Sequence, residues 1–206
     1  MNFSLKKDTL IYVAGHKGLI GSAFIRFFKE NDYTNIITRS RVELELTSKS
    51  DTSDFFRNNH PEVVILAAGK VGGLIANRDY PFDFISENLS IQVNVINAAH
   101  KYGTKKLIFF GSSCMYPKNS FRPMIESQIF TGNIDPLSIA YATAKYSGIQ
   151  MCQAMNQQFD SSSFISVIPN SVYGPNDNFD LNSSHVLSAL VRRIHEAKSN
   201  NLSSVT

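Results

Sequence analysis

The sequence predicts an α/β protein of the Rossmann type, in which a doubly wound parallel sheet carries helices on both faces. The first indication is that short, almost continuously apolar segments alternate with segments of helical periodicity, as is typical of parallel strands buried between helices. The second is a glycine-rich turn that joins the first apolar segment, TLIYVAG, to the first helical one. The third is size, because 206 residues, 43% of them hydrophobic and 18% charged, are enough for a domain with a sizeable core.

Each element follows from its own pattern. Apolar runs predict strands at 9–15, 35–40, 62–69 and 105–113, and in a segment, 163–175, that runs into a loop. Apolar residues at helical spacing predict helices at 18–31, 48–59, 82–103, 138–159 and 184–198. The final residues, NNLSSVT, are typical of the beginning of one more strand. We therefore expect a cofactor-binding domain over 1–175 and, over 176–206, the start of a smaller substrate-binding domain that is largely missing.

The composition argues against several classes of function. The net charge of +3 is small and scattered, so we expect no binding to nucleic acid. The apolar stretches are far shorter than the ~20 residues of a membrane span, and the N-terminal one is too short for a signal peptide. Two cysteines, Cys114 and Cys152, without an export signal favour a reduced, cytoplasmic setting in which Cys114 is a free thiol. The histidines show no paired spacing with cysteines or carboxylates, so we expect no metal site.

The turn GHKGLIG predicts a dinucleotide site. Its glycines allow a tight turn and let the backbone approach a pyrophosphate, which the N-terminus of the following helix attracts. The alternative is a plain strand–helix turn, but the strand before it and the helix after it favour the cofactor. The residues expected to bind the cofactor here are Gly15, His16, Lys17, Gly18, Leu19, Ile20 and Gly21.

The end of the second predicted strand favours NADP(H) over NAD. A carboxylate at this position would bond the ribose 2′-hydroxyl, whereas this chain has Arg39 and Arg41, with Lys17 in the glycine turn. These cations suit a 2′-phosphate. The alternative is that both arginines are ordinary surface residues.

Tyr141 and Lys145 form a Y-x-x-x-K motif on a predicted long helix. The spacing of four places both on one helix face, where the ammonium group would stabilise the phenolate. Ser112, at the end of the fourth predicted strand, could bond a substrate oxygen. Together the three residues predict a hydride-transfer site in which tyrosine donates the proton, serine orients the substrate and lysine tunes the tyrosine.

Cys114 and His185 each allow two interpretations from the residues alone. Cys114 follows the same strand end as Ser112, and it is either a buried core cysteine or a group that moves a proton. His185 stands in the polar run NSSHV, which could simply cap a helix.

Longer motifs carry a resemblance to a known family. The glycine turn and the Ser112, Tyr141 and Lys145 pattern resemble those of the extended short-chain dehydrogenase/reductases that act on nucleotide sugars. Within that family, the chain looks most similar to the NADPH-dependent 3,5-epimerase/4-reductases that convert GDP-4-keto-6-deoxy-D-mannose to GDP-L-fucose. The segments that carry this likeness are LAAGKVGGLIANRDYPFDFISEN, LIFFGSSCMYPK and YGPNDNFDLNSSHVLSALVRRIHEA.

The resemblance implies a role for each matching residue. Cys114 and His185 would be the base and the acid that invert C3 and C5 of the sugar. Arg193 would contact the diphosphate of the GDP-sugar, and Asn170 would lie near the nicotinamide. The family also implies a homodimer, packed through the helices at 82–103 and 138–159.

Two alternatives stay open: a UDP-sugar 4-epimerase of the same fold, which needs no Cys114–His185 pair, and a truncated, non-catalytic NADP-binding protein.

Overall fold

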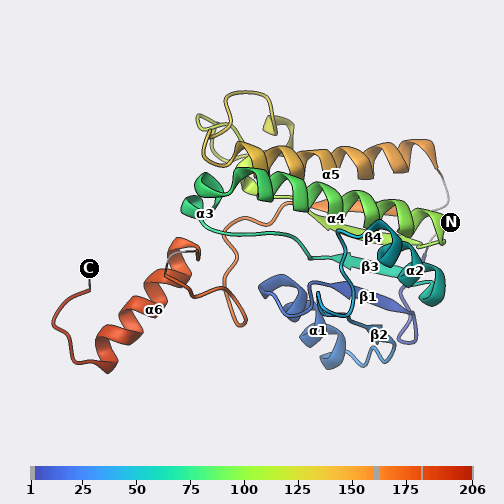
Figure 1. The fold of residues 1–206 in the computed structure, drawn as a ribbon, viewed down its shortest axis with the longest axis horizontal. Coiled ribbons are helices and arrows are strands. Elements are labelled where there is room, and N and C mark those ends of the chain that lie inside the picture. Colours follow the sequence, from blue (N-terminus) through green and yellow to red (C-terminus); the bar gives the residue numbers. More distant parts are fainter. Residues whose placement is uncertain (1–2, 160–162, 182, 206) are drawn as a thin grey trace.

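A computed structural model describes residues 3–159, 163–181 and 183–205. Five strands form one parallel sheet in the order β2-β1-β3-β4-β5 (Figure 1). The chain starts at β1, forms β2 on one side of it and then crosses back to form β3 on its other side. This reversal of strand order is the position at which doubly wound sheets bind ligands, beyond the carboxyl ends of the strands. The strands are β1 (Ile11–Ala14), β2 (Ile36–Ile37), β3 (Val63–Leu66), β4 (Lys106–Phe110) and β5 (Ser163–Val167).

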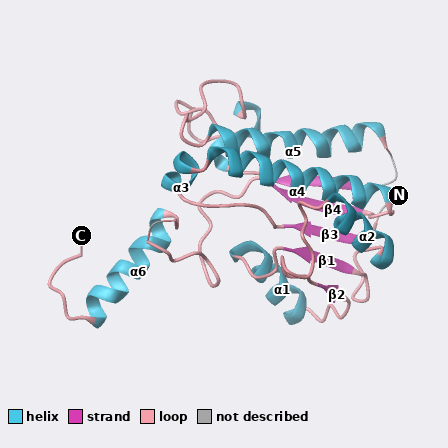
Figure 2. Ribbon diagram, in the orientation of Figure 1, coloured by secondary structure: helices cyan, strands magenta, loops and turns pink. Residues whose placement is uncertain are grey.

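Helices lie on both faces of the sheet, which confirms the predicted fold class (Figure 2). On one face lie α2 (Lys49–Asn59), α4 (Pro81–Lys101) and α5 (Ile139–Gln158), with α4 and α5 side by side. On the other face lies α1 (Leu19–Glu30). The remaining helical segments are α3 (Leu74–Asp79), α6 (Val186–Ser199) and two 3₁₀ turns, η1 (Ser113–Met115) and η2 (Glu126–Gln128).

Side chains of each strand alternate between two apolar clusters. Tyr12 and Ala14 of β1 join the larger cluster, under α2, α4 and α5, whereas Ile11 and Val13 join the smaller one, under α1. The smaller cluster ends before β5, where Ile165 and Val167 are 40% and 41% exposed. The α1 side of the sheet is therefore only partly covered by helices.

Two segments differ from the sequence-based expectation. The six-residue helix α3 was not predicted, because so short a segment has no periodicity to detect. A strand was expected at the end of the chain, and this prediction is wrong for 201–205, which form a turn and irregular backbone. A strand needs a neighbouring strand to pair with, and the described residues place none beside this segment.

Helix α6 extends away from the sheet and keeps much of its apolar side exposed (Figure 1). Val186, Val191 and Ile194 are all at least half exposed, whereas Ser188 and Ala197 are buried. Ser188 donates a hydrogen bond to the Asp177 carboxylate, which ties the first turn of the helix to the preceding loop. None of the described helices combines the length and the apolar character needed to cross a membrane.

Candidate active site

The glycine turn after β1 has the backbone that the sequence predicted. Gly15 has φ +80°, and a Cβ there would lie 2.7 Å from the backbone of Ala67, so only glycine fits. A Cβ at Gly21 would lie 2.2 Å from the Gly15 carbonyl oxygen, which shows how tightly α1 starts against the turn. By contrast, a Cβ at Gly18 would meet only one atom, at 3.6 Å. Gly18 is the N-cap of α1 and no side chain caps this end, so its N–H groups can bind an anion.

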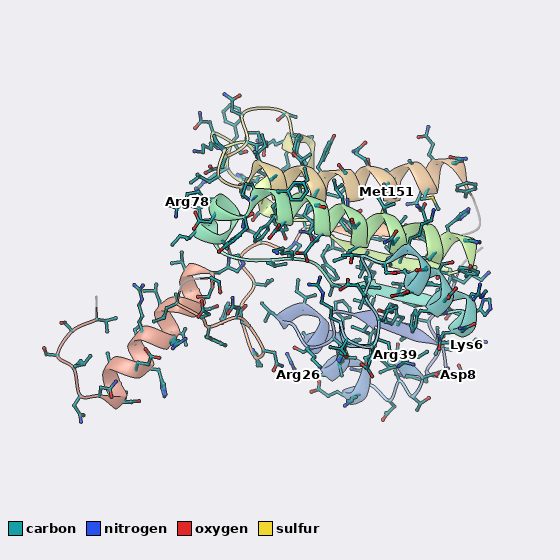
Figure 3. The ribbon with its side chains drawn as sticks, in the orientation of Figure 1. Lys6, Asp8, Arg26, Arg39, Arg78 and Met151 are labelled. Carbon is teal, nitrogen blue, oxygen red and sulfur yellow. The ribbon has the colours of Figure 1, made fainter. Side chains whose placement is uncertain are left out.

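The end of β2 holds a carboxylate among donors and cations. One oxygen of Glu43 accepts hydrogen bonds from the Ser40 N–H at 2.7 Å and the Ser40 hydroxyl at 2.6 Å. These bonds, chiefly that from the hydroxyl, hold the pKa of Glu43 below its usual value, and Arg39 and Lys17 add to the effect. The residues around Ser40 therefore already stabilise one negative charge, as a ribose phosphate site must. In Figure 3 the Arg39 side chain is labelled near the part of the sheet where β2 lies.

Arg41, the other predicted cofactor residue at this strand end, lies in ion pairs. Its guanidinium is 2.7 Å from Glu45 and 3.2 Å from Glu87. Glu87 also pairs with Lys70 at 2.8 Å. Arg41 is thus linked to α4 through Glu87, whereas Arg39 lies beside Glu43.

Ser112, Tyr141 and Lys145 come together where β4 ends and α5 begins. Ser112 caps η1, and its hydroxyl accepts a hydrogen bond from the Cys114 N–H at 3.3 Å. Tyr141 and Lys145 lie one turn apart on α5, with the ammonium nitrogen 5.8 Å from the centre of the phenol ring. The ring also packs edge-on against Phe84 of α4. The sequence-predicted spacing therefore does place both side chains together.

Burial dominates the ionisation of both α5 residues. It raises the pKa of Tyr141, which the nearby Cys114 raises further and the Ser112 hydroxyl lowers. Burial also lowers the pKa of Lys145 to about 8. The expected stabilisation of a phenolate by Lys145 is thus outweighed by burial in this structure. A tyrosine that stays protonated at neutral pH can still donate its proton to a stronger base, such as a developing alkoxide.

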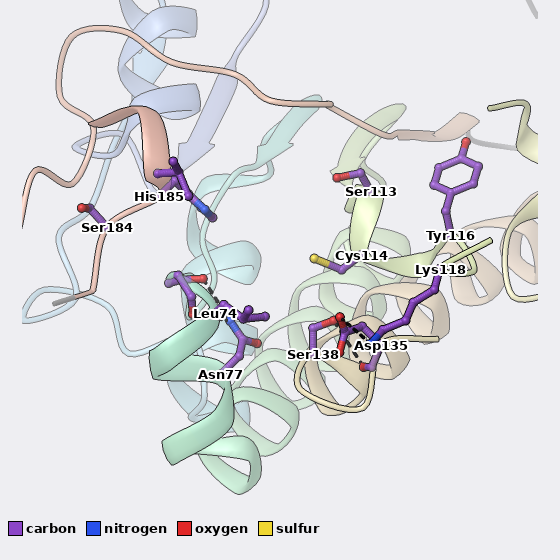
Figure 4. A pocket seen from close by; sticks show the side chains of 13 residues that line it. Leu74, Asn77, Ser113, Cys114, Tyr116, Lys118, Asp135, Ser138, Ser184 and His185 are labelled. Carbon is purple, nitrogen blue, oxygen red and sulfur yellow. Dashed lines mark hydrogen bonds and ion pairs between the residues drawn. The ribbon is translucent and has the colours of Figure 1, made fainter. Parts of the chain in front are cut away.

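Cys114 and His185 line one pocket of about 420 Å³ (Figure 4). Cys114 follows Ser112 on η1, and its side chain is partly exposed. His185 is the N-cap residue of α6, but its side chain makes no capping hydrogen bond, so the capping explanation does not account for the imidazole. A thiol from the turn after β4 and an imidazole from the start of α6 thus face the same space. Ser112 adjoins this space, being next in the chain to Ser113, which lines it.

The remaining predicted site residues, Arg193, Asn170 and His16, also lie outside this pocket. Arg193, on α6, is not among the described residues that line it. Asn170 lies in the exposed loop after β5 and accepts a hydrogen bond from Ser171 at 3.3 Å. His16 lines a second pocket, of about 440 Å³, together with Arg26 and Lys29 of α1.

Several residues of the pocket that Cys114 and His185 line were not predicted from the sequence. Asn77 of α3 is 6% exposed, and its amide group donates hydrogen bonds to the carbonyls of Gly72 and Gly73. Lys118 and Asp135 form an ion pair of 3.3 Å at the edge of the pocket. The segment VGGLIAN, with two glycines before Asn77, was the only local sign of this part of the pocket. Because so short a loop has no hydrophobic periodicity, the sequence could not show that the asparagine is buried. Among the described residues, no three His, Cys, Asp or Glu side chains gather as a metal site requires.

Comparisons with known proteins show which proteins this chain is similar to. The chain is 51% identical over 206 residues to a putative GDP-L-fucose synthase 2 of Arabidopsis thaliana, matching 99% of this chain and 62% of that protein. It is 44% identical to the GDP-L-fucose synthase of Escherichia coli, over 93% of this chain and 59% of that protein. The chain therefore spans about three fifths of the length of these relatives.

A solved structure shows the same fold. The GDP-L-fucose synthetase of Naegleria fowleri bound to NADP superposes with a TM-score of 0.90 at 28% identity, over 99% of this chain and 67% of that one. The model of the NAD dependent epimerase/dehydratase family matches residues 11–205, which include the glycine turn, Tyr141, Lys145 and His185. On this match, together with the parallel sheet and the glycine turn, the chain belongs to the NAD dependent epimerase/dehydratase family.

Proposed function

We propose that this chain carries the catalytic residues of an NADPH-dependent enzyme that epimerises GDP-4-keto-6-deoxy-D-mannose at C3 and C5 and reduces it at C4 to GDP-L-fucose. The observation that carries this proposal is that Cys114 and His185 line one pocket directly beside Ser112 and Tyr141. A reductase needs only the serine, tyrosine and lysine. A separate thiol and imidazole are what proton exchange next to a ketone requires.

The residues present fit NADP(H). The open space at Gly18, the uncapped start of α1 and the charges of Lys17 and Arg39 suit a dinucleotide with a 2′-phosphate. The relative from Naegleria fowleri, whose fold is the same, has NADP bound. When bound, NADPH supplies the hydride for the reduction. On this proposal Gly15 through Gly21, Arg41, Lys145 and Asn170 also contact the cofactor.

The chain's own residues perform the proton transfers. The Cys114 thiolate removes a proton from the carbon next to the ketone, whose enolate carries charge on the C4 oxygen. Ser112 and Tyr141 stabilise that oxygen by hydrogen bonding. His185 returns a proton on the opposite face, which inverts the carbon. Tyr141 finally protonates the C4 oxygen as it becomes an alkoxide, and Arg193 binds the diphosphate of the substrate.

The test is incubation of the protein with GDP-4-keto-6-deoxy-D-mannose and NADPH in heavy water. The proposal expects deuterium at C3 and C5 together with NADPH oxidation. Tyr141→Phe should stop the oxidation but leave the exchange, whereas Cys114→Ser should stop the exchange. If neither reaction is seen with a chain extended to the length of its relatives, the proposal is wrong, and a UDP-sugar 4-epimerase or a non-catalytic NADP-binding protein becomes the better reading.

We also propose a cytoplasmic homodimer formed through α4 and α5. These two long helices form one layer whose outer side faces away from the sheet (Figure 1). On the same proposal, residues 1–175 form the cofactor-binding domain and 176–206 begin the substrate-binding region. Sedimentation of the protein tests the dimer, and a monomer at all concentrations would contradict it.

A further inference from the structure

His185 reaches the pocket through a contact between two segments far apart in the sequence. The loop before α3 meets the segment before α6, where the N–H of Gly73 donates to the Ser183 carbonyl at 2.8 Å. A Cβ at Gly73 would lie 2.5 Å from the Ser184 carbonyl oxygen, so a side chain at this position would push the two segments apart. The backbone just before His185 therefore rests directly on Gly73.

Asn77 holds this loop in place. Its Nδ2 atom donates to the Gly72 carbonyl at 3.0 Å and to the Gly73 carbonyl at 3.1 Å. The residue is 6% exposed, and the bond to Gly73 is buried while the bond to Gly72 is partly buried. One buried amide group thus fixes both glycines, and through Gly73 it fixes the segment that leads to His185. Figure 4 shows Asn77 on α3, on the same side of the pocket as His185 and facing the Cys114 turn.

Stability alone does not explain an asparagine here. The Oδ1 atom of Asn77 is buried and has no hydrogen-bond partner among the described residues. The cost of leaving that buried oxygen without a partner is comparable to what the two bonds of Nδ2 contribute. The net gain in stability is small, so what the asparagine adds is mainly the geometry of the loop.

We infer that Asn77 is a positioning residue, which holds His185 opposite Cys114 through the Gly72–Gly73 loop and Ser183. That the position of His185 matters for catalysis rests on the proposed function, in which His185 returns a proton. That Asn77 holds the segment before α6 in place does not depend on the proposed function. The two statements can therefore be tested separately.

The first test measures geometry and needs no substrate. Cys152→Ser and His185→Cys together leave one thiol at position 114 and one at position 185, which a short bis-maleimide should link. Adding Asn77→Leu should slow the linking at least threefold. Asn94→Leu is the matched control, because Asn94 also donates to two carbonyls, those of Leu46 and Thr47, each at 3.0 Å, away from this pocket. Equal linking rates with and without Asn77→Leu, or no linking in the reference protein, would overturn the inference.

The second test measures the proposed reaction. Asn77→Leu should lower solvent exchange at C3 and C5 at least tenfold, while the Kd for NADPH changes less than twofold. Asn77→Ser keeps a donor for one carbonyl, so it should recover part of the exchange, and it serves if Asn77→Leu does not fold. Exchange at the original rate in both variants would overturn the inference. Absence of exchange with Asn77 in place, in a chain extended to the length of its relatives, would instead contradict the proposed function, and the linking experiment would still decide the role of Asn77.

Discussion

The ammonium nitrogen of Lys145 lies 5.8 Å from the centre of the Tyr141 ring, and both side chains are more than nine-tenths buried. Burial acts on them in opposite directions, raising the pKa of the phenol and lowering that of the lysine to about 8. In both cases it favours the neutral form. The pair is therefore poised so that tyrosine keeps its proton while lysine gives up its charge just above neutral pH.

A buried ammonium group destabilises the fold, so we expect Lys145→Met to stabilise it. The folded-state pKa is about 8, below the value near 10.5 of an unfolded lysine. The unfolded chain thus binds more protons between these values, and the stability of the unaltered protein rises with pH across that range. Below pH 8 the full cost applies, so the variant should gain up to ~3 kcal/mol at pH 7, and the gain should vanish near pH 10.5.

Denaturant unfolding at pH 7 and at pH 10 measures this difference. Lys105→Met, at an exposed lysine just before β4, is the control and should show no such pH-dependent gain. An equal or lower stability of Lys145→Met at pH 7 would mean that the ammonium has a partner that compensates its burial. NADPH oxidation should be lost in Lys145→Met on the proposed function.

The two cysteines should differ sharply in reactivity. Cys152 is 1% exposed, and burial raises the pKa of its thiol to about 11, whereas Cys114 is partly exposed in the pocket. Because only the thiolate reacts, iodoacetamide at pH 8 should label Cys114 at least tenfold faster than Cys152 in the folded protein. Mass spectrometry of the labelled peptides gives both rates. Labelling of Cys152 at the faster rate would contradict the packing of α5 on the sheet.

Glu43 should compete with the 2′-phosphate of NADP(H). Its carboxylate takes up the N–H and the hydroxyl of Ser40, beside Arg39 and Lys17. Glu43→Gln removes a negative charge from this place, so the affinity for NADP⁺ should rise threefold to tenfold, while that for NAD⁺ should not rise. Fluorescence or calorimetric titration measures both, with Glu30→Gln as a control for loss of charge elsewhere. Weaker NADP⁺ binding would mean that Glu43 instead orients Ser40 and Arg39.

The parts of the site that could be predicted are those written in local patterns. The glycine turn and the Tyr141–Lys145 pair each occupy a few neighbouring residues, and the structure places both as expected. The Cys114–His185 pocket joins residues some seventy positions apart, so it entered the prediction only through a resemblance to a family. Asn77 could not be predicted, because its role depends on a contact between the loop before α3 and the segment before α6.

The exposure of β5 on the α1 side of the sheet could not be predicted from the sequence pattern. The strand expected within 163–175 belongs to a parallel sheet that was predicted to be covered on both faces. Ile165 and Val167 are instead partly exposed, because the apolar cluster under α1 takes in side chains of β1, β3 and β4 and ends before β5. A hydrophobic pattern predicts which residues are suited to burial, but it does not predict which of them are covered by another element of the structure.

Gly15 and Gly103 allow the cost of crowding at the cofactor turn to be separated from backbone strain. Both have positive φ, +80° and +83°, so alanine at either position adopts an unfavourable backbone conformation. At Gly103 a Cβ would meet no atom within 4 Å, whereas at Gly15 it would lie 2.7 Å from the Ala67 and Ala68 backbone. We expect Gly103→Ala to cost about 1 kcal/mol of unfolding free energy, from strain alone. Gly15→Ala should cost at least ~2 kcal/mol more, because β1 and β3 must separate where the turn crosses them. Thermal or urea unfolding of the two variants gives both values, and equal costs would show that the turn can move away from β3.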